Sequence, residues 1–289
     1  MIEKAVKIIQ EKHYNIYCVC EYRNGKIQSA QLRPANRLNN IYSLSKNFTA
    51  TAIGMLADRG ALSLQDGIAR HLSRYSRAAQ DKKFETITLH NLLTHTCGFG
   101  RGMLFEADQR THGTDNWADA ALREPTPYRP GEKSVYSNAT YYLLSLIVEN
   151  TVRATLFDFL RTELFLPLSF ENFASSACPL GHTQGATGFF LAAQDFVKLG
   201  ILYLNGGVYE GKRYLSEEFV RTATSPLCTA GERLYGYSFW KNRADGALFY
   251  GDGAHGQILA VDPDREIVLA VQGYDDTLSA KDFVSFLFE

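Results

Sequence analysis

Along the first forty residues, apolar and polar positions follow first the spacing of a helix and then that of strands. Residues 2–12 place apolar side chains at helical spacing and predict a short amphipathic helix. Residues 14–21 and 26–32 have the pattern of two strands, joined at Asn24-Gly25, a pair typical of a two-residue hairpin turn. The chain is therefore predicted to begin with a helix and a β-hairpin.

A helix with almost no polar face is predicted to begin at Ser43 and to continue to about Asp58, before Gly60. Apolar or small residues on every side of a helix indicate that it is buried nearly all round. Residues 88–95 and 195–204 are further predicted helices. Between about residues 67 and 184, helices and long loops dominate.

Strand patterns return near the C-terminal end of the chain. The predicted strands cover residues 235–241, 246–250, 257–261 and 266–271, and residues 279–288 form a closing helix. Strands from both ends make one antiparallel sheet, with the helix from Ser43 packed on it. We predict an α+β fold (an α/β sandwich) in a single domain, residues 1–289. Its α/β lobe covers about 1–66 and 185–289, and an inserted helical lobe covers about 67–184.

Composition excludes several classes of partner. The 289 residues carry a net charge of -1 with both signs interspersed, so nucleic acid and anionic membranes are not expected partners. No apolar run approaches the roughly 20 residues of a membrane span. The first ten residues lack the apolar centre and cleavage site of a signal peptide. Five scattered cysteines favour reduced thiols, and together these features predict a cytoplasmic protein.

The segment Ser43-Leu44-Ser45-Lys46 carries the strongest chemical signal. A serine and a lysine three residues apart at a helix start share one face. An amine in a dry pocket loses proton affinity, so a neutral Lys46 can accept the Ser43 proton. A second Ser-x-x-Lys, residues 238–241, lies in a predicted strand, where positions i and i+3 face opposite ways.

Tyr136-Ser137-Asn138 supplies the groups that would complete such a site. It follows the turn Pro130-Gly131-Glu132 and precedes a helical pattern. The Tyr-x-Asn segments at residues 22 and 203 are explained by the hairpin turn and by a helix end. A hydroxyl nucleophile, an amine, a phenol and an amide together indicate acyl transfer. His95, in a leucine-rich helix, is expected to be a core histidine rather than a ligand.

Two glycine-rich segments are weak nucleotide-binding candidates. Gly251-Asp252-Gly253-Ala254-His255-Gly256 matches Gly-x-Gly-x-x-Gly, but a predicted strand follows it where a dinucleotide fold needs a helix. Residues 206–212 end in Gly-Lys but continue with Arg213 rather than Ser or Thr. Neither predicts a phosphate site.

Five segments, in this order, resemble motifs of one family. The chain resembles the serine beta-lactamase and penicillin-recognising hydrolases, in their class C, esterase and 6-aminohexanoate-oligomer hydrolase branch. The resemblance implies a five-stranded antiparallel sheet flanked by helices, with the site between the sheet and a helical lobe. The matching segments are residues 43–49, 60–66, 92–98, 130–138 and 195–207.

The resemblance implies roles for individual residues. Ser43 is the implied acylated nucleophile, Lys46 its proton acceptor, Tyr136 the general base or relay, and Asn138 a clamp for the substrate amide. No metal or organic cofactor is implied.

The family's third motif aligns with Gly251-Asp252-Gly253, followed by Ala254. In that register the backbone N–H groups of Ser43 and Ala254 form the oxyanion hole. Here the chain departs from the family, because Gly251 replaces the cation and Asp252 replaces the hydroxyl residue. His255 is the remaining candidate for a cation.

These departures shape the predicted activity. A carboxylate at Asp252 would repel an anionic substrate, unless that side chain turns away and caps a turn. We therefore expect a small ester, amide or short peptide as substrate, with poor activity on beta-lactams and better activity on neutral esters or on amides that carry an amine. The alternatives are a DD-peptidase or beta-lactamase acting on penicillin-like substrates, and a catalytically idle peptide-binding homologue. The oligomeric state stays open.

Overall fold

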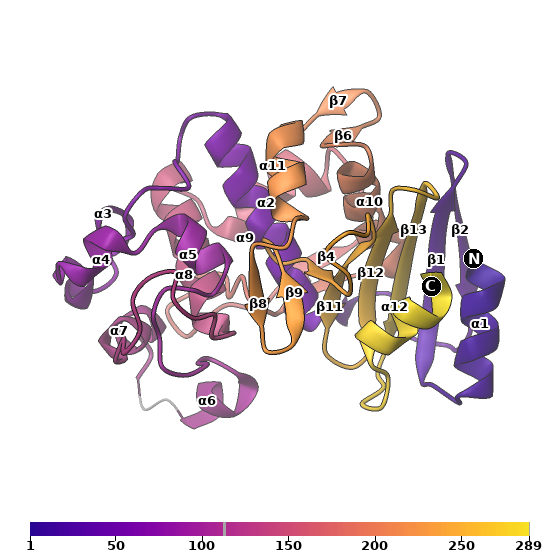
Figure 1. The fold of residues 1–289 in the computed structure, drawn as a ribbon, viewed down its shortest axis with the longest axis horizontal. Coiled ribbons are helices and arrows are strands. Elements are labelled where there is room, and N and C mark those ends of the chain that lie inside the picture. The colour runs from indigo at the N-terminus through magenta and orange to yellow at the C-terminus, as the bar shows by residue number, and fades with distance from the viewer. Residues whose placement is uncertain (112–113, 289) are drawn as a thin grey trace.

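A computed structural model describes residues 1–111 and 114–288. Figure 1 shows a twisted sheet with α1 (Ile2–Glu11) and α12 (Ala280–Phe288) beside it, and a helical region at the opposite end. The long helix α2 (Ser45–Asp58) lies between these two regions. The lobe boundaries at residues 66/67 and 184/185 stay a prediction.

The main sheet has eight strands within the described residues, in the order β2-β1-β13-β12-β11-β10-β9-β8. Each pair of neighbouring strands in this sheet runs antiparallel, which confirms the predicted α+β class. The expected number of five is too small, because three strands of two or three residues extend the β11 edge. The bounds are β1 (Ile16–Arg23), β2 (Lys26–Gln31), β8 (Cys228–Ala230), β9 (Arg233–Tyr235), β10 (Trp240–Lys241), β11 (Phe249–Gly253), β12 (Gln257–Asp262) and β13 (Ile267–Gly273).

Both faces of the sheet centre are buried, and alternate residues serve opposite faces. In β12, Ile258 packs in the cluster formed with α1 and α12, whereas Leu259 belongs to the larger core shared with the helices. Val268 and Leu269 divide in the same way in β13. The sheet is therefore covered on both faces, as an α/β sandwich requires.

The hairpin predicted at Asn24-Gly25 is confirmed. Both residues have positive φ, 52° and 75°, as a two-residue turn of this hand requires. The single strand predicted over residues 235–241 is wrong. Tyr235 instead pairs with Trp240 across a tight turn, in which Ser238 has a φ of 67°. The segment is a hairpin, β9-β10.

Helices fill the middle of the chain, as the sequence predicts. Within the described residues, no helix combines the length and apolar character that a bilayer span needs. Smaller elements are β3 (Asn39–Asn40), β4 (Phe173–Ser175), β5 (Phe189–Leu191), β6 (Val208–Tyr209) and β7 (Lys212–Arg213). The helices include α3 (Ala69–Leu72), α4 (Lys83–Thr86), α5 (Leu89–Leu93), α6 (Glu106–Thr111), α7 (Trp117–Arg123), α8 (Asn138–Val152), α9 (Leu156–Leu160), α10 (Ala193–Leu204) and α11 (Glu217–Ala223).

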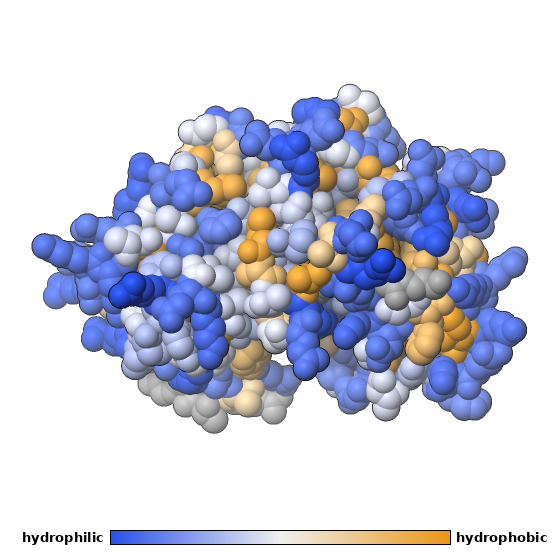
Figure 2. Space-filling view, viewed as in Figure 1, coloured by the Kyte–Doolittle hydropathy of each residue, from blue (hydrophilic) through white to orange (hydrophobic). Residues whose placement is uncertain are grey.

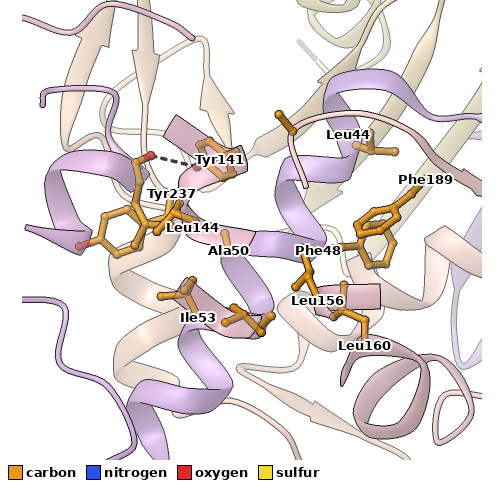
Figure 3. Packing of buried hydrophobic residues seen from close by; sticks show 14 of the residues in the cluster. Leu44, Phe48, Ala50, Ile53, Tyr141, Leu144, Leu156, Leu160, Phe189 and Tyr237 are labelled. Atoms are coloured by element: carbon orange, nitrogen blue, oxygen red, sulfur yellow. Dashed lines mark hydrogen bonds between the residues drawn. The ribbon is translucent and has the colours of Figure 1, made fainter. Parts of the chain in front are cut away.

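Helix α2 is buried nearly all round, which confirms the expectation from its composition. All residues from Ser45 to Leu56 are buried. Figure 3 shows Phe48 facing Phe189. The predominantly apolar environment holds the start of α2 firmly in place. On the face drawn in Figure 2, hydrophobic residues gather near the middle, in the region of β8 and β9, with hydrophilic residues around them.

Candidate active site

Ser43 lies in a 3₁₀ turn, Tyr42–Leu44, immediately before α2. The α-helix therefore begins two residues later than predicted. Tyr42 has a φ of 47°, unusual for a non-glycine residue, and its backbone N–H donates to Asn40 Oδ1 at 2.9 Å. This bent entry leaves Ser43 half-buried, while Leu44 is fully buried.

Strand β11 lies directly against this turn. A methyl group on Gly253 would overlap the Ile41 carbonyl oxygen, and one on Gly251 would overlap the Leu44 side chain. Both glycines therefore permit a close approach that a larger residue would block. The close approach leaves no room for a side chain at Gly251, the position at which the resemblance implies a basic residue.

The Lys46 amine is enclosed by three oxygen atoms. Its Nζ lies 3.1 Å from Ser43 Oγ, 2.7 Å from Asn138 Oδ1 and 2.9 Å from the Ala186 carbonyl oxygen. Lys46 is only 1% exposed, and this burial lowers its pKa well below the ordinary value, although the negative charge of Asp252 opposes the shift. A neutral amine beside a serine hydroxyl can accept its proton.

Tyr136 is positioned by the start of helix α8. The next residue, Ser137, caps that helix by accepting from the Ala139 N–H at 3.2 Å. The Tyr136 ring centroid lies 4.8 Å from Lys46 Nζ. Burial raises the pKa of Tyr136, and a hydrogen bond with Ser43 acts in the opposite direction. Tyr136 therefore contacts both Ser43 and Lys46.

Asn138 is held at both ends of its amide by the protein itself. Its Oδ1 accepts from Lys46, and its Nδ2 donates to the Leu104 carbonyl at 3.0 Å. Asn138 is 7% exposed. This geometry gives it a role that the sequence did not predict, the orientation of the Lys46 amine. Its expected contact with a substrate amide stays a prediction.

His95 supports Tyr136 from behind. The two ring centroids are 4.5 Å apart, and the His95 ring nitrogens contact Thr140 Oγ1 at 2.7 Å and Tyr235 Oη at 3.2 Å. Burial lowers the pKa of His95 well below its usual value, so the ring is neutral. A buried histidine with both nitrogens satisfied is a core residue, as expected.

Asp252 does not stand alone in the site. Arg233 Nη1 donates to Asp252 Oδ2 at 2.7 Å, and the Arg233 guanidinium carbon lies 3.7 Å from the Trp240 ring centroid. Burial raises the pKa of Asp252, and Arg233 partly offsets that effect. The neighbouring strands β9, β10 and β11 bring these three residues together. The expected unpaired anion is therefore half of an ion pair.

A pocket of about 390 Å³ joins these groups. Of the residues predicted from the sequence, it brings together Ser43, Tyr136, Asp252 and Ala254, with Lys46 bonded behind Ser43. Arg233 is not among the residues predicted for the site, and Trp240, in the single strand predicted over residues 235–241, was expected to serve packing rather than binding. The complete lining consists of Ser43, Tyr136, Ala230, Gly231, Arg233, Trp240, Asp252 and Ala254.

His255 is outside that lining and faces another group. Its Nδ1 contacts Asp276 Oδ1, its ring stacks on Tyr274 with centroids 4.3 Å apart, and it meets Tyr42 edge-on at 4.6 Å. His255 therefore connects the turn after β11 with the turn that carries Ser43. Arg233, rather than His255, supplies a cation to the pocket.

Comparison with known proteins finds relatives in sequence and in fold. A family model described as Beta-lactamase matches residues 17–276. Penicillin-binding protein 4* of Bacillus subtilis (strain 168) is 31% identical over 151 residues, which cover 50% of this chain and 32% of that protein. Protein flp of Staphylococcus aureus (strain NCTC 8325 / PS 47) is 29% identical over 157 residues, 51% of this chain and 31% of that protein. The matches span about a third of these relatives.

Solved structures share the fold across nearly the whole chain. A Bacillus anthracis protein provisionally described as a 6-aminohexanoate-dimer hydrolase superimposes with a TM-score of 0.84 at 18% identity, covering 98% of this chain and 80% of that one. A class C beta-lactamase mutant superimposes with a TM-score of 0.75 at 15% identity, covering 98% and 93%. At these identities the likeness concerns the fold alone.

Proposed function

The chain belongs to the beta-lactamase family of serine hydrolases, and on that basis we propose that it hydrolyses a small ester or amide through an acyl-enzyme on Ser43. The observation that carries the proposal is the 3.1 Å separation of Ser43 Oγ and Lys46 Nζ, together with the burial that lowers the pKa of this amine. Proximity and a lowered pKa are the two conditions for a lysine base.

The proposed reaction has two steps. Ser43 Oγ attacks the substrate carbonyl while its proton passes to the Lys46–Tyr136 pair, and the backbone N–H groups of Ser43 and Ala254 stabilise the oxyanion. The pair then returns the proton to the leaving alcohol or amine, and the C–O or C–N bond breaks. In the second step, water deprotonated by the same pair attacks the acyl group and releases the acid and Ser43.

The contacts of Lys46 and Tyr136 also argue against an idle binding homologue. A buried lysine that must be neutral in the folded protein destabilises that fold unless its pocket compensates. Here three oxygen atoms surround the amine, and Tyr136 contacts both Ser43 and Lys46. Such an arrangement supports proton transfer, which a peptide-binding site does not need.

A DD-peptidase or beta-lactamase is the second candidate function. One relative is named as a penicillin-binding protein, whereas a structural neighbour is described as a 6-aminohexanoate-dimer hydrolase. The glycine at position 251, in place of a basic residue, is an argument against an anionic substrate. Arg233 weakens that objection, because its guanidinium lines the pocket beside Ser43.

Parallel rate measurements distinguish these activities. We expect the wild-type protein to turn over p-nitrophenyl acetate, with much slower turnover of a chromogenic cephalosporin. Ser43→Ala should abolish both activities, whereas Ser238→Ala, in the other Ser-x-x-Lys segment, is the matched control and should retain them. Cephalosporin turnover equal to or faster than ester turnover would favour the second candidate, and no turnover of either substrate would favour the binding homologue.

A further inference from the structure

We propose that Arg233 is a specificity-determining residue that binds an anionic group of the substrate, and that Asp252 weakens this binding by competing for the same guanidinium. The inference rests on the proposed hydrolase function and narrows its substrate class. It selects esters or amides that carry a carboxylate at a distance from the reacting carbonyl.

The first observation is where the cation comes from. The third-motif strand, β11, has Gly251 at the position of the family's basic residue, and that glycine faces Leu44. Arg233 lies instead on β9, which β10 separates from β11, and it lines the same pocket as Ser43. The pocket therefore holds a positive charge that its own β11 strand does not provide.

The second observation is how firmly the guanidinium is held. It lies against the Trp240 ring at 3.7 Å and donates through Nη1 to Asp252 at 2.7 Å. Stacking and a charged hydrogen bond fix an arginine before a ligand arrives, which lowers the entropy lost on binding. A preorganised planar cation is well suited to a carboxylate.

The third observation is that the arginine keeps access to solvent and to further partners. The Arg233 side chain is 31% exposed and that of Asp252 is 23% exposed. A guanidinium carries five N–H donors. Within the described residues, hydrogen bonds to Asp252 and to the Tyr250 side chain engage part of this set. The remaining donors are available to a ligand in the pocket.

Asp252 sets the strength of this recognition. Its charge cancels that of Arg233 at long range, so the pair attracts a distant anion weakly. The carboxylate of a substrate also competes with Asp252 for the N–H donors of the Arg233 guanidinium. The pair therefore discriminates at contact rather than by general attraction, and neutralising Asp252 should strengthen the preference for a carboxylate-bearing substrate.

The test compares p-nitrophenyl hydrogen adipate, which carries one carboxylate, with its neutral methyl ester. The readout is the ratio of the two kcat/KM values, with Ser43→Ala as the blank, so that a general loss of activity cancels. Arg233→Gln should lower this ratio roughly tenfold, the scale of one charge-assisted hydrogen bond. Arg265→Gln removes an arginine paired with Asp262 in the β12–β13 turn and should leave the ratio unchanged.

A double-mutant cycle separates recognition from simple repulsion. Asp252→Asn should raise the ratio, and Arg233→Gln should still lower it roughly tenfold in the Asp252→Asn background, where no unpaired carboxylate remains to repel the substrate. A ratio that Arg233→Gln leaves unchanged in that background would overturn the inference, because the loss in the single variant would then come only from repulsion by the unpaired Asp252. A ratio in Arg233→Gln within twofold of wild type would also overturn it.

A binding measurement keeps this test separate from the proposed activity. If neither ester acylates Ser43, the hydrolase proposal fails, and adipate itself becomes the probe. Its binding should change the fluorescence of Trp240, which stacks on Arg233. The change should be lost in Arg233→Gln and in Trp240→Phe, and a wild-type protein with no adipate-dependent change would overturn the inference.

Discussion

Replacement of Lys46 by methionine removes the amine that is proposed as the base and leaves a side chain that fills a similar volume. The substitution removes Nζ contacts with Ser43 Oγ at 3.1 Å, Asn138 Oδ1 at 2.7 Å and the Ala186 carbonyl at 2.9 Å. Loss of the general base should lower turnover roughly 10²–10⁴-fold. Two buried acceptors lose a donor at about 1–3 kcal/mol each, partly offset because no amine is desolvated.

The same variant tests the charge state of Lys46 through the pH dependence of unfolding. The folded-state pKa of Lys46 lies well below 10.5, with burial as the main cause. Between that value and 10.5, the unfolded chain binds one more proton than the folded chain. The free energy of unfolding of the wild-type protein should therefore rise with pH in this window, by about 1.4 kcal/mol per pH unit relative to Lys46→Met.

Urea unfolding at pH 7, 8 and 9 and constant ionic strength measures this difference. Fluorescence and circular dichroism should give the same transition, so that a two-state free energy is defined. Lys7→Met, which removes an amine that is 75% exposed, is the matched control for the loss of a positive charge. If the gap between wild type and Lys46→Met stays constant from pH 7 to 9, the folded-state amine is still protonated there, as it is in the unfolded chain, and this result would contradict the base role. Lys46→Arg, which cannot deprotonate, should be as inactive as the methionine variant.

Substitutions at three further positions test the surroundings of Ser43. Tyr136→Phe should lower the acylation rate with p-nitrophenyl acetate at least about tenfold, because a relay hydroxyl is lost; an unchanged rate in stopped-flow measurements would exclude that role. Gly253→Ala should lower the free energy of unfolding by about 1–3 kcal/mol, because its methyl group overlaps the Ile41 carbonyl, and urea unfolding at pH 7 measures it. His255→Ala should lower kcat about threefold to tenfold with little change in KM, because its ring joins the two turns that carry the proposed oxyanion donors. His255→Phe, which keeps the ring, should recover most of that loss, and a failure to recover would contradict the stacking role.

Elements fixed by local sequence were predicted well. The Asn24-Gly25 hairpin and the buried helix after Ser43 depend on a turn pair and on a run of apolar and small residues. Ser43 and Lys46 are three residues apart, so one local geometry determines their contact. Tyr136 was found because its motif stands between a turn and a helix, although nothing local reveals which residues it contacts.

The charge on the pocket wall could not be read from local sequence. Arg233 and Asp252 are 19 residues apart and meet only because β9 turns sharply into β10 and pairs onward to β11. The signal for that turn was present in Gly236 and Ser238, but the flanking aromatic residues read as one continuous strand. Had a hairpin been predicted at these residues, it would have placed Arg233 on the same side of the sheet as the third motif.

Intact-protein mass after incubation with a fluorophosphonate tests the central claim, that Ser43 is an activated nucleophile. The account predicts one covalent adduct on the wild-type protein and none on Ser43→Ala, with Ser238→Ala labelled like wild type. The absence of an adduct on the wild-type protein, or an adduct that persists in Ser43→Ala, would contradict it.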